Sequence, residues 1–146
     1  MSDATSYFSM HPSALETGVP GTWVNTNEDV DPIEMVPGLM FRPIVGKDLA
    51  VNIVRFEPHT EAPVHAHPEE QITLVLEGEF EFEVNGEQRI LKPGMSVVIP
   101  PNTPHGARTF DTTCVEIDVF HPPRKGLLDA MQAQQVRREE GTEAGA

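Results

Sequence analysis

The sequence predicts an all-β protein, a sandwich or closed barrel of short antiparallel strands with an irregular amino-terminal arm and a short carboxy-terminal helix. Short apolar or alternating runs, separated by turn residues, fill the middle of the chain. Proline and glycine are frequent, with 14 and 11 copies in 146 residues. Helix formers gather only near the end. We expect an arm at 1–38, a barrel at 39–124, and a helix with a frayed tail at 125–146.

The arm is rich in Pro, Gly, Asn, Asp and Glu, and Trp23 with Val24 is its clearest apolar anchor. The segments "GLMFRPIVG" and "LAVNIVRFEP" then read as two strands, bounded by Gly46 and Pro58. The run "QITLVLEG" at 71–78 is almost unbroken in its apolar character, as expected of a strand that is covered on both faces.

The stretch "EFEFEVNGEQRI" gives the clearest local pattern. Phe80, Phe82 and Val84 fall on one face of a strand, with glutamates on the other. Asn85-Gly86 favours a tight hairpin turn, because both residues tolerate positive φ.

The last part of the barrel begins with a turn at Pro93-Gly94, followed by a strand, a proline-rich turn and another strand. "TTCVEIDVFHPP" reads as the final strand, which Pro122-Pro123 ends. In the tail that follows, Leu127, Leu128 and Met131 lie on one side of the expected helix.

Composition limits the kinds of partner and the cellular compartment that we expect for this protein. The formal net charge of −13 disfavours nucleic acid and anionic membranes, which both need a basic surface. Cys114 is the single cysteine, so an internal disulfide is impossible. The first residues lack the basic and apolar regions of a signal peptide, and no segment resembles a membrane span. We expect a cytoplasmic protein that acts on a small molecule.

Four residues stand out as candidate metal ligands. In an extended strand His65 and His67 point to the same face, Gln71 has the same parity, and His105 follows the proline-rich turn. Neutral imidazoles suit Zn, Fe, Ni, Mn or Cu, and an amide oxygen completes the set. A His-x-His pair is by itself also compatible with two surface histidines.

The spacing of these residues resembles the cupin family. His65-x-His67-(x3)-Gln71-(x6)-Gly78 matches the first cupin motif, with glutamine in the usual glutamate position, and Gly94-(x5)-Pro100-(x4)-His105 matches the second. The resemblance covers roughly 38–124 and implies a small antiparallel jelly-roll barrel. It also implies one divalent metal ion (Zn, Fe, Ni or Mn) held by His65, His67, Gln71 and His105.

The chain departs from the family motifs at two expected turn positions. His59 and Asn102 stand where the family usually has glycine, and asparagine tolerates positive φ. As a further imidazole, His59 is more simply a surface residue, and we expect His121 at an outward or rim position. Glu69 is an alternative carboxylate ligand.

A second resemblance concerns "DVFHPPR" at 118–124. Asp118, Phe120 and Arg124 match a pattern in a cupin branch that shares the glutamine form and includes enzymes of pectin breakdown. Those enzymes convert unsaturated uronates to open-chain ketonic forms, and there the matching residues line the pocket. We assign catalytic roles to Asp118, as proton shuttle, and to Arg124, as a carboxylate clamp. An Asp118–Arg124 pair at a strand end is the structural alternative.

Three further residues are expected to bind substrate: Phe120, Arg42 and Arg55, the two arginines lying within predicted strands. For a strand arginine the solvent face is the alternative position. Many cupins pair through a barrel face, and the run at 71–78 is apolar on both sides, so we also expect a homodimer.

The glutamine indicates the type of chemistry. Three imidazoles and an amide leave the full charge on a divalent ion, which then polarises a bound group strongly. We therefore expect a metal-dependent enzyme of the isomerase or lyase type, with a redox-neutral, proton-shuttling isomerisation, ring opening or cyclisation on a substrate such as a sugar acid. The alternatives are an Fe(II)-dependent dioxygenase, a cupin-type polyketide cyclase and a non-catalytic ligand-binding or metal-binding module.

Overall fold

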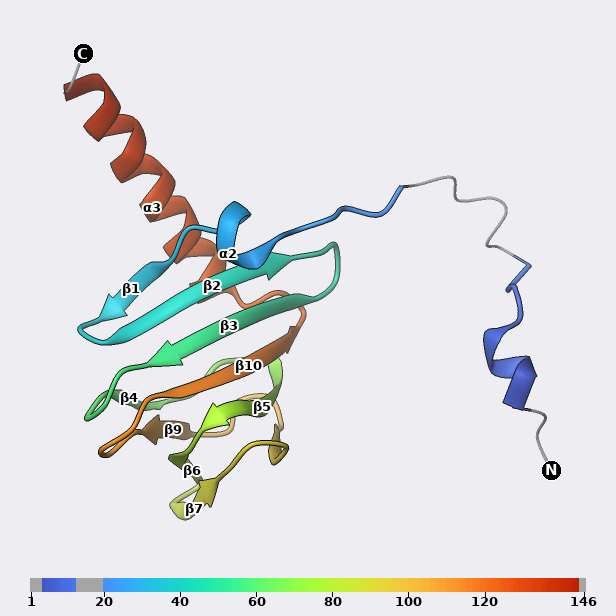
Figure 1. Cartoon of the computed structure of the whole chain (residues 1–146), viewed down its shortest axis with the longest axis horizontal. Coiled ribbons are helices and arrows are strands. Elements are labelled where there is room, and N and C mark those ends of the chain that lie inside the picture. Colours follow the sequence, from blue (N-terminus) through green and yellow to red (C-terminus); the bar gives the residue numbers. More distant parts are fainter. Residues whose placement is uncertain (1–3, 13–19, 145–146) are drawn as a thin grey trace.

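The computed structural model describes residues 4–12 and 20–144, and within them two antiparallel sheets face each other around one interior (Figure 1). The order of the larger sheet is β1-β2-β3-β10-β5-β8, and that of the smaller sheet is β4-β9-β6-β7. The strands of the larger sheet are β1 (Ile33–Val36), β2 (Leu39–Val45), β3 (Ala50–Phe56), β10 (Cys114–His121), β5 (Glu70–Gly78) and β8 (Ser96–Ile99). Those of the smaller sheet are β4 (Glu61–His65), β9 (His105–Arg108), β6 (Phe80–Val84) and β7 (Glu87–Leu91).

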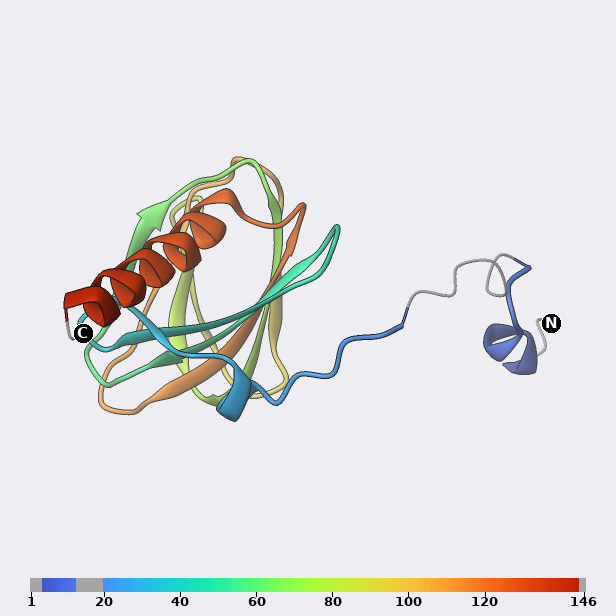
Figure 2. The same ribbon diagram turned by 90° about the horizontal axis from the view of Figure 1, so that it is seen from above.

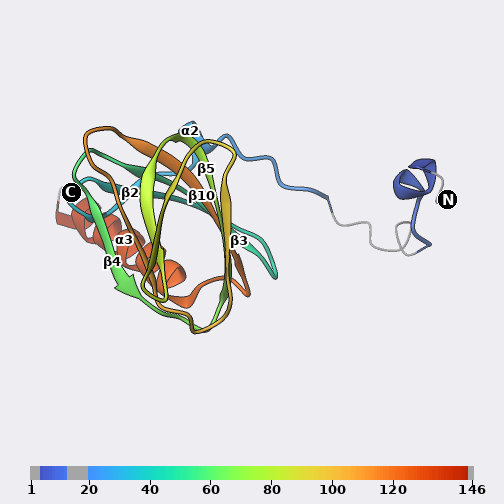
Figure 3. The ribbon, with the colours of Figure 1, turned by 90° about the horizontal axis from the view of Figure 1, so that it is seen from below.

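The sheets curve into the expected all-β barrel, and a helix lies beside it (Figure 2). Seen from the opposite side, strands of both sheets still surround the same interior (Figure 3). The helices are the 3₁₀ helix η1 (Ala4–Phe8), the short α2 (Thr26–Asp29) and α3 (Lys125–Ala144). Among the described residues, no helix combines the length and the apolar character that crossing a membrane requires.

The expected turns form where residues tolerate a left-handed backbone. Asn85 and Gly86 have φ of 50° and 82°, which is the backbone of the tight hairpin between β6 and β7. His59 and Asn102, the two departures from glycine in the family motifs, have φ of 53° and 60°. Both are therefore turn positions, as the sequence predicts, and neither disturbs the barrel.

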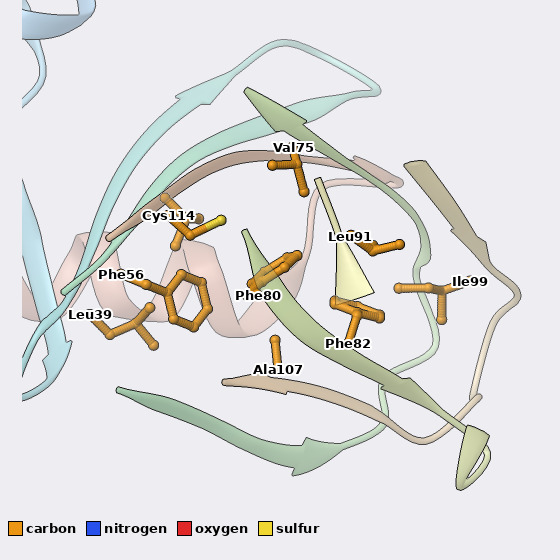
Figure 4. Close-up of a cluster of buried hydrophobic side chains, with 10 residues drawn as sticks. Leu39, Phe56, Val75, Phe80, Phe82, Leu91, Ile99, Ala107 and Cys114 are labelled. Carbon is orange, nitrogen blue, oxygen red and sulfur yellow. The ribbon is translucent and has the colours of Figure 1, made fainter. Parts of the chain in front are cut away.

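The core lies between the two sheets (Figure 4). Phe80 and Phe82 are buried on β6, which confirms the predicted inward face. Phe80 also meets Phe56 of the opposite sheet edge to face, with ring centroids 5.4 Å apart. Burying a large aromatic side chain contributes roughly 1.5–3 kcal/mol, so this cluster holds the two sheets together. Its other members are Leu39, Val54, Val75, Leu91, Ile99, Ala107 and Cys114.

Two boundaries differ from the expectation. Residues 33–36 form β1 on the edge of the larger sheet, although their composition placed them in the arm. Helix α3 runs from Lys125 to Ala144 and so includes residues that were expected to belong to a frayed tail. It is anchored by Leu127, which packs with Ala50 and Phe120, and by Gln134, which donates to the carbonyl of Pro32 at 2.8 Å.

The outer face of β5 is not covered within the described chain. Gln71, Thr73 and Val75 are buried on the inner face, whereas Ile72 and Leu76 are 41% and 44% exposed. The unbroken apolar run therefore lines the interior on one side only. Its other side is an apolar surface.

Candidate metal centre

Two strands of the smaller sheet, one loop and one strand of the larger sheet bring the three histidines and Gln71 together. His65 ends β4 and is the register partner of His105, which begins β9 in the same sheet. His67 lies in the loop that leads to β5, and Gln71 lies on β5 in the opposite sheet. One ring nitrogen from each histidine lies within 4.8 Å of the others. The structure thus gathers all four expected ligands.

Backbone carbonyls fix the orientation of each imidazole. The Nδ1 atoms of His65, His67 and His105 lie 2.7, 3.1 and 2.7 Å from the carbonyl oxygens of Pro63, Glu69 and Thr103. A carbonyl oxygen can only accept, so each Nδ1 carries the hydrogen. Each Nε2 is then left with its lone pair free, which is the form that binds a metal ion.

Gln71 turns its oxygen toward these nitrogens. Its Oε1 lies 3.0 Å from His67 Nε2 and 3.2 Å from His105 Nε2. Its Nε2 donates to Thr73 Oγ1 at 2.9 Å and to Asp118 Oδ1 at 3.1 Å. Because Asp118 can only accept as a carboxylate, this network determines which end of the amide faces the histidines.

The resulting donor set fits a metal ion. Three imidazole nitrogens and one amide oxygen, all acceptors, converge without a hydrogen between them, which is unfavourable unless a cation lies at their centre. Neutral nitrogen donors and one oxygen suit borderline divalent ions such as zinc or iron.

Burial keeps the imidazoles in their neutral form. It lowers the pKa of all three histidines and takes the pKa of His105 to about 4, although the hydrogen bond to the Thr103 carbonyl acts in the opposite direction. Imidazoles that are neutral in neutral solution need not lose a proton before they bind a metal ion.

Glu69, the alternative ligand, points elsewhere. Its Oε2 accepts from the backbone nitrogen of Lys125 at 3.2 Å, at the amino end of α3, where a carboxylate is favoured by the helix dipole. Its Oε1 lies 3.4 Å from His67 Nδ1, on the side of the ring away from Gln71. Glu69 therefore supports a ligand and connects the site to α3.

A cavity of about 260 Å³ opens beside His65 and is lined by Phe41, Asn52, Phe120 and Arg124 among other residues. A deeper hollow shares His65 and Arg124 with it and reaches Gln71, His105, Glu116 and Asp118. Asp118 lines the second hollow, Phe120 lines the first cavity, and Arg124 lines both. The Arg124 guanidinium stacks over the Phe120 ring at 5.7 Å from its centroid.

The two strand arginines do not reach this space, which corrects the expectation for them. Arg42 Nη1 donates to the carbonyls of Thr26 and Val30, at 3.2 and 2.7 Å, and so holds the segment around α2 on the outer face. Arg55 pairs with Glu57 at 3.0 Å at the exposed surface. Both have the outward parity of their strands, which is the alternative position considered for them.

His59, His121 and Trp23 lie at the surface. His59 lies 3.1 Å from Asp111 with both side chains largely exposed, and His121 is exposed at the end of β10. Trp23 is 95% exposed, so it does not anchor the arm on the described part of this chain.

Three polar residues of the site were not expected from the sequence. Thr73 donates to Asp118 Oδ1 at 2.7 Å, and Glu116 and Asn52 are buried, each with one side-chain oxygen that has no hydrogen-bond partner among the described residues. A signal was available, because Thr73 shares the parity of Gln71, and Glu116 shares that of Asp118.

Comparisons with known proteins agree with this geometry. A model of the Cupin domain matches residues 52–120. The pectin degradation protein KdgF of Dickeya dadantii (strain 3937) is 35% identical over 82 residues, 56% of this chain and 74% of that protein. The solved structure of KdgF from Halomonas sp. has a TM-score of 0.65 and 33% identity, and the match covers 69% of this chain and 95% of that one.

A further relative, the H2HPP isomerase of Bacillus subtilis, is 39% identical over 74 residues, which are 49% of this chain and 31% of that protein. The barrel, the motif histidines and these matches agree. The chain belongs to the cupin superfamily, and within it resembles the pectin-degradation branch.

Proposed function

We propose that this protein is a metal-dependent cupin enzyme that isomerises or opens the ring of a small sugar acid, without net oxidation or reduction. The observation that carries the proposal is the position of Gln71. Its oxygen faces the Nε2 atoms of His67 and His105, and its nitrogen donates to Asp118, so one side chain links the ligand set to a carboxylate beside the cavity. An unsaturated uronate is the favoured substrate because the KdgF proteins are similar to this chain.

Arg124 is the residue that would bind the substrate carboxylate. Burial lowers the pKa of its guanidinium, and the carboxylates of Asp118 and Glu69 counteract this effect. Arginine remains protonated even so, and its planar donor set matches a carboxylate in two parallel hydrogen bonds. Phe120, beneath the guanidinium, keeps it over the cavity.

Asp118 is the proton carrier in this proposal. Its Oδ1 accepts from Thr73 and Gln71, which fixes the carboxylate between the ligand set and the cavity. A carboxylate held there can take a proton from one carbon or oxygen of the substrate and return it to another. Leu39 and Phe41 line both parts of the cavity and limit the access of water to this exchange.

A divalent ion held by His65, His67, His105 and Gln71 would polarise a substrate carbonyl or hydroxyl and make the neighbouring proton more acidic. The neutral donor set leaves the charge of the ion undiminished, which suits this role better than oxygen activation. An anionic ligand would help to stabilise oxidised iron.

The test is to strip the purified protein of metal, reload it with zinc, manganese, nickel or ferrous iron, and follow an unsaturated uronate by NMR with oxygen uptake recorded in parallel. Loss of the ring form without oxygen uptake is the expected result. Asp118→Asn should lower kcat at unchanged metal content, Arg124→Met should raise KM, and Arg55→Met serves as the surface control. Oxygen uptake with ferrous iron, or full activity of Asp118→Asn, would contradict the proposal.

A further inference from the structure

Glu116 is a buried carboxyl group that the proposed reaction does not use. Along the inner face of β10 the side chains run from the core to the mouth in the order Cys114, Glu116, Asp118, Phe120. Glu116 is 3% exposed and lines the deeper hollow together with Asp118. It is therefore the deeper of two neighbouring carboxyl groups.

The two groups need one proton between them. Glu116 and Asp118 lie two residues apart on the same inward face of β10 and line the same hollow, so their carboxyl groups are neighbours in a largely apolar setting. A buried carboxylate beside a second carboxylate is strongly disfavoured, so we expect the pair to retain one proton.

The available donors decide which group carries that proton. Asp118 Oδ1 accepts from Thr73 at 2.7 Å and from Gln71 at 3.1 Å, and donors of this kind stabilise the ionised form. Glu116 lies against apolar core residues, and its Oε2 has no partner within the part of the chain that the structure describes. Asp118 is thus supplied with two donors, whereas the Oε2 atom of Glu116 has none among the described residues.

We propose that Glu116 is held as a neutral carboxylic acid that donates its proton to Asp118, and so acts as a positioning residue for that carboxylate. Its donation, with those of Thr73 and Gln71, would fix Asp118 on three sides while leaving the ligand set uncharged apart from the ion. The positioning role rests on the proposed function of Asp118, whereas the location of the proton does not.

The surrounding charges support the assignment. Burial raises the pKa of Glu116 well above its usual value, and Asp118 and Cys114 on the same strand raise it further. The other titratable groups that line the same hollow are His65, His105 and Arg124. The two histidines are neutral through burial, and Arg124 lies at the mouth with both Asp118 and Glu69 acting on it.

Infrared spectroscopy of the metal-loaded protein near neutral pH tests the proposal without any substrate. A protonated carboxylic acid has a carbonyl stretch apart from that of carboxylates. The wild type should show one such band, Glu116→Gln should lose it, and Asp118→Asn should keep it at a shifted frequency because the acceptor has changed. The matched control is Glu77→Gln, an exposed carboxylate on β5, which should leave the band unaltered.

Each alternative outcome overturns the proposal. Absence of the band in the wild type means that Glu116 is ionised. A band lost in Asp118→Asn and kept in Glu116→Gln means that Asp118 carries the proton. A band that Asp118→Asn leaves unmoved means that the two groups do not share a hydrogen bond.

Urea denaturation over a pH series gives a second measurement. Glu116 is protonated in the folded state and ionised in the unfolded chain above the ordinary value of 4.5. The ratio of the folding constants of Glu116→Gln and wild type should therefore rise about tenfold per pH unit above that value. A flat ratio would contradict a neutral Glu116. These experiments stand even if the uronate assay fails.

Discussion

Replacement of Gln71 by glutamate probes the link between the ligand set and Asp118. The two side chains have nearly the same shape, but the variant puts a carboxylate oxygen where the wild type has an NH₂ group. That position lies 3.1 Å from Asp118 Oδ1 and 2.9 Å from Thr73 Oγ1. The site loses the donor that holds Asp118 and gains a like charge beside it.

The size of the effect follows from this distance. Two unit charges 3.1 Å apart repel by roughly 5 kcal/mol at an effective dielectric constant of about 20, which corresponds to about four pKa units. The pair should therefore keep one proton in neutral solution. Because the folded variant holds a proton that the unfolded chain releases above about pH 4.3, its stability relative to wild type should fall by about 1.4 kcal/mol per pH unit. The accumulated loss is roughly 3–4 kcal/mol by pH 7.

The assay is urea denaturation of both metal-free proteins from about pH 4 to pH 7. Gln88→Glu is the matched control, because Gln88 Nε2 donates to Glu83 Oε1 at 3.2 Å at the exposed surface. There water screens the new repulsion, and the stability difference should stay nearly flat. Parallel pH profiles for the Gln71→Glu variant and wild type would refute the reasoning.

Turnover gives the functional counterpart of this prediction. In the metal-loaded variant the ion attracts the carboxylate at position 71, so the retained proton falls on Asp118, which would then be a poorer base. At equal metal loading kcat should fall and the acidic limb of the pH-rate profile should move to higher pH. Equal kcat with an unmoved profile would mean that turnover needs the Gln71 amide neither to hold Asp118 nor to keep a like charge away from it.

Four further outcomes are expected. His67→Ala should weaken metal binding by roughly 100-fold or more, because removing a direct ligand costs more affinity than removing a residue that only hydrogen-bonds to a ligand. Native metal affinity in a competition titration would argue against the site. Between about pH 7 and pH 4 the free energy of unfolding of the metal-free wild type should fall by roughly 3 kcal/mol more than that of His105→Gln. The reason is that the pKa of His105 is lowered from 6.5 to about 4, so the stability that its neutral ring contributes is present above pH 6.5 and is lost as the pH falls. Urea curves that change equally in the two proteins would exclude this effect. We also propose a homodimer that covers the apolar outer face of β5 and β8, where Ile72 pairs with Val98; sedimentation should show a dimer that the double change of Ile72 and Val98 to lysine dissociates, and a wild-type monomer at micromolar concentration would contradict it. Phe80→Ala should destabilise the barrel by roughly 3–5 kcal/mol in denaturant titrations, whereas Phe110→Ala, at a side chain that is 44% exposed, should cost much less.

The sequence by itself determined the features that depend on neighbouring residues. Alternation placed Phe80 and Phe82 inside, Asn85-Gly86 predicted the hairpin, and the motif spacing identified the four candidate ligands. The inward face and the hairpin follow from the two-residue period of a strand and from the backbone freedom of turn residues, whereas the ligand set rests on the resemblance to the cupin motifs. The left-handed turns at His59 and Asn102 belong to the same class, since asparagine and a motif position were sufficient to predict them.

Tertiary structure alone decided what each polar side chain meets. Arg42 and Arg55 lie within strands as expected, but only the register of β2 and β3 turns them outward, away from Asn52 and the cavity. The pairing of β5 with β10 sets Gln71 and Thr73 beside Asp118, and Glu116 inward at the level of the core. These partners are 45 or more residues apart in the chain. The period of a single strand specifies two faces, whereas the packing of the barrel determines which face is inside and which polar side chains meet there.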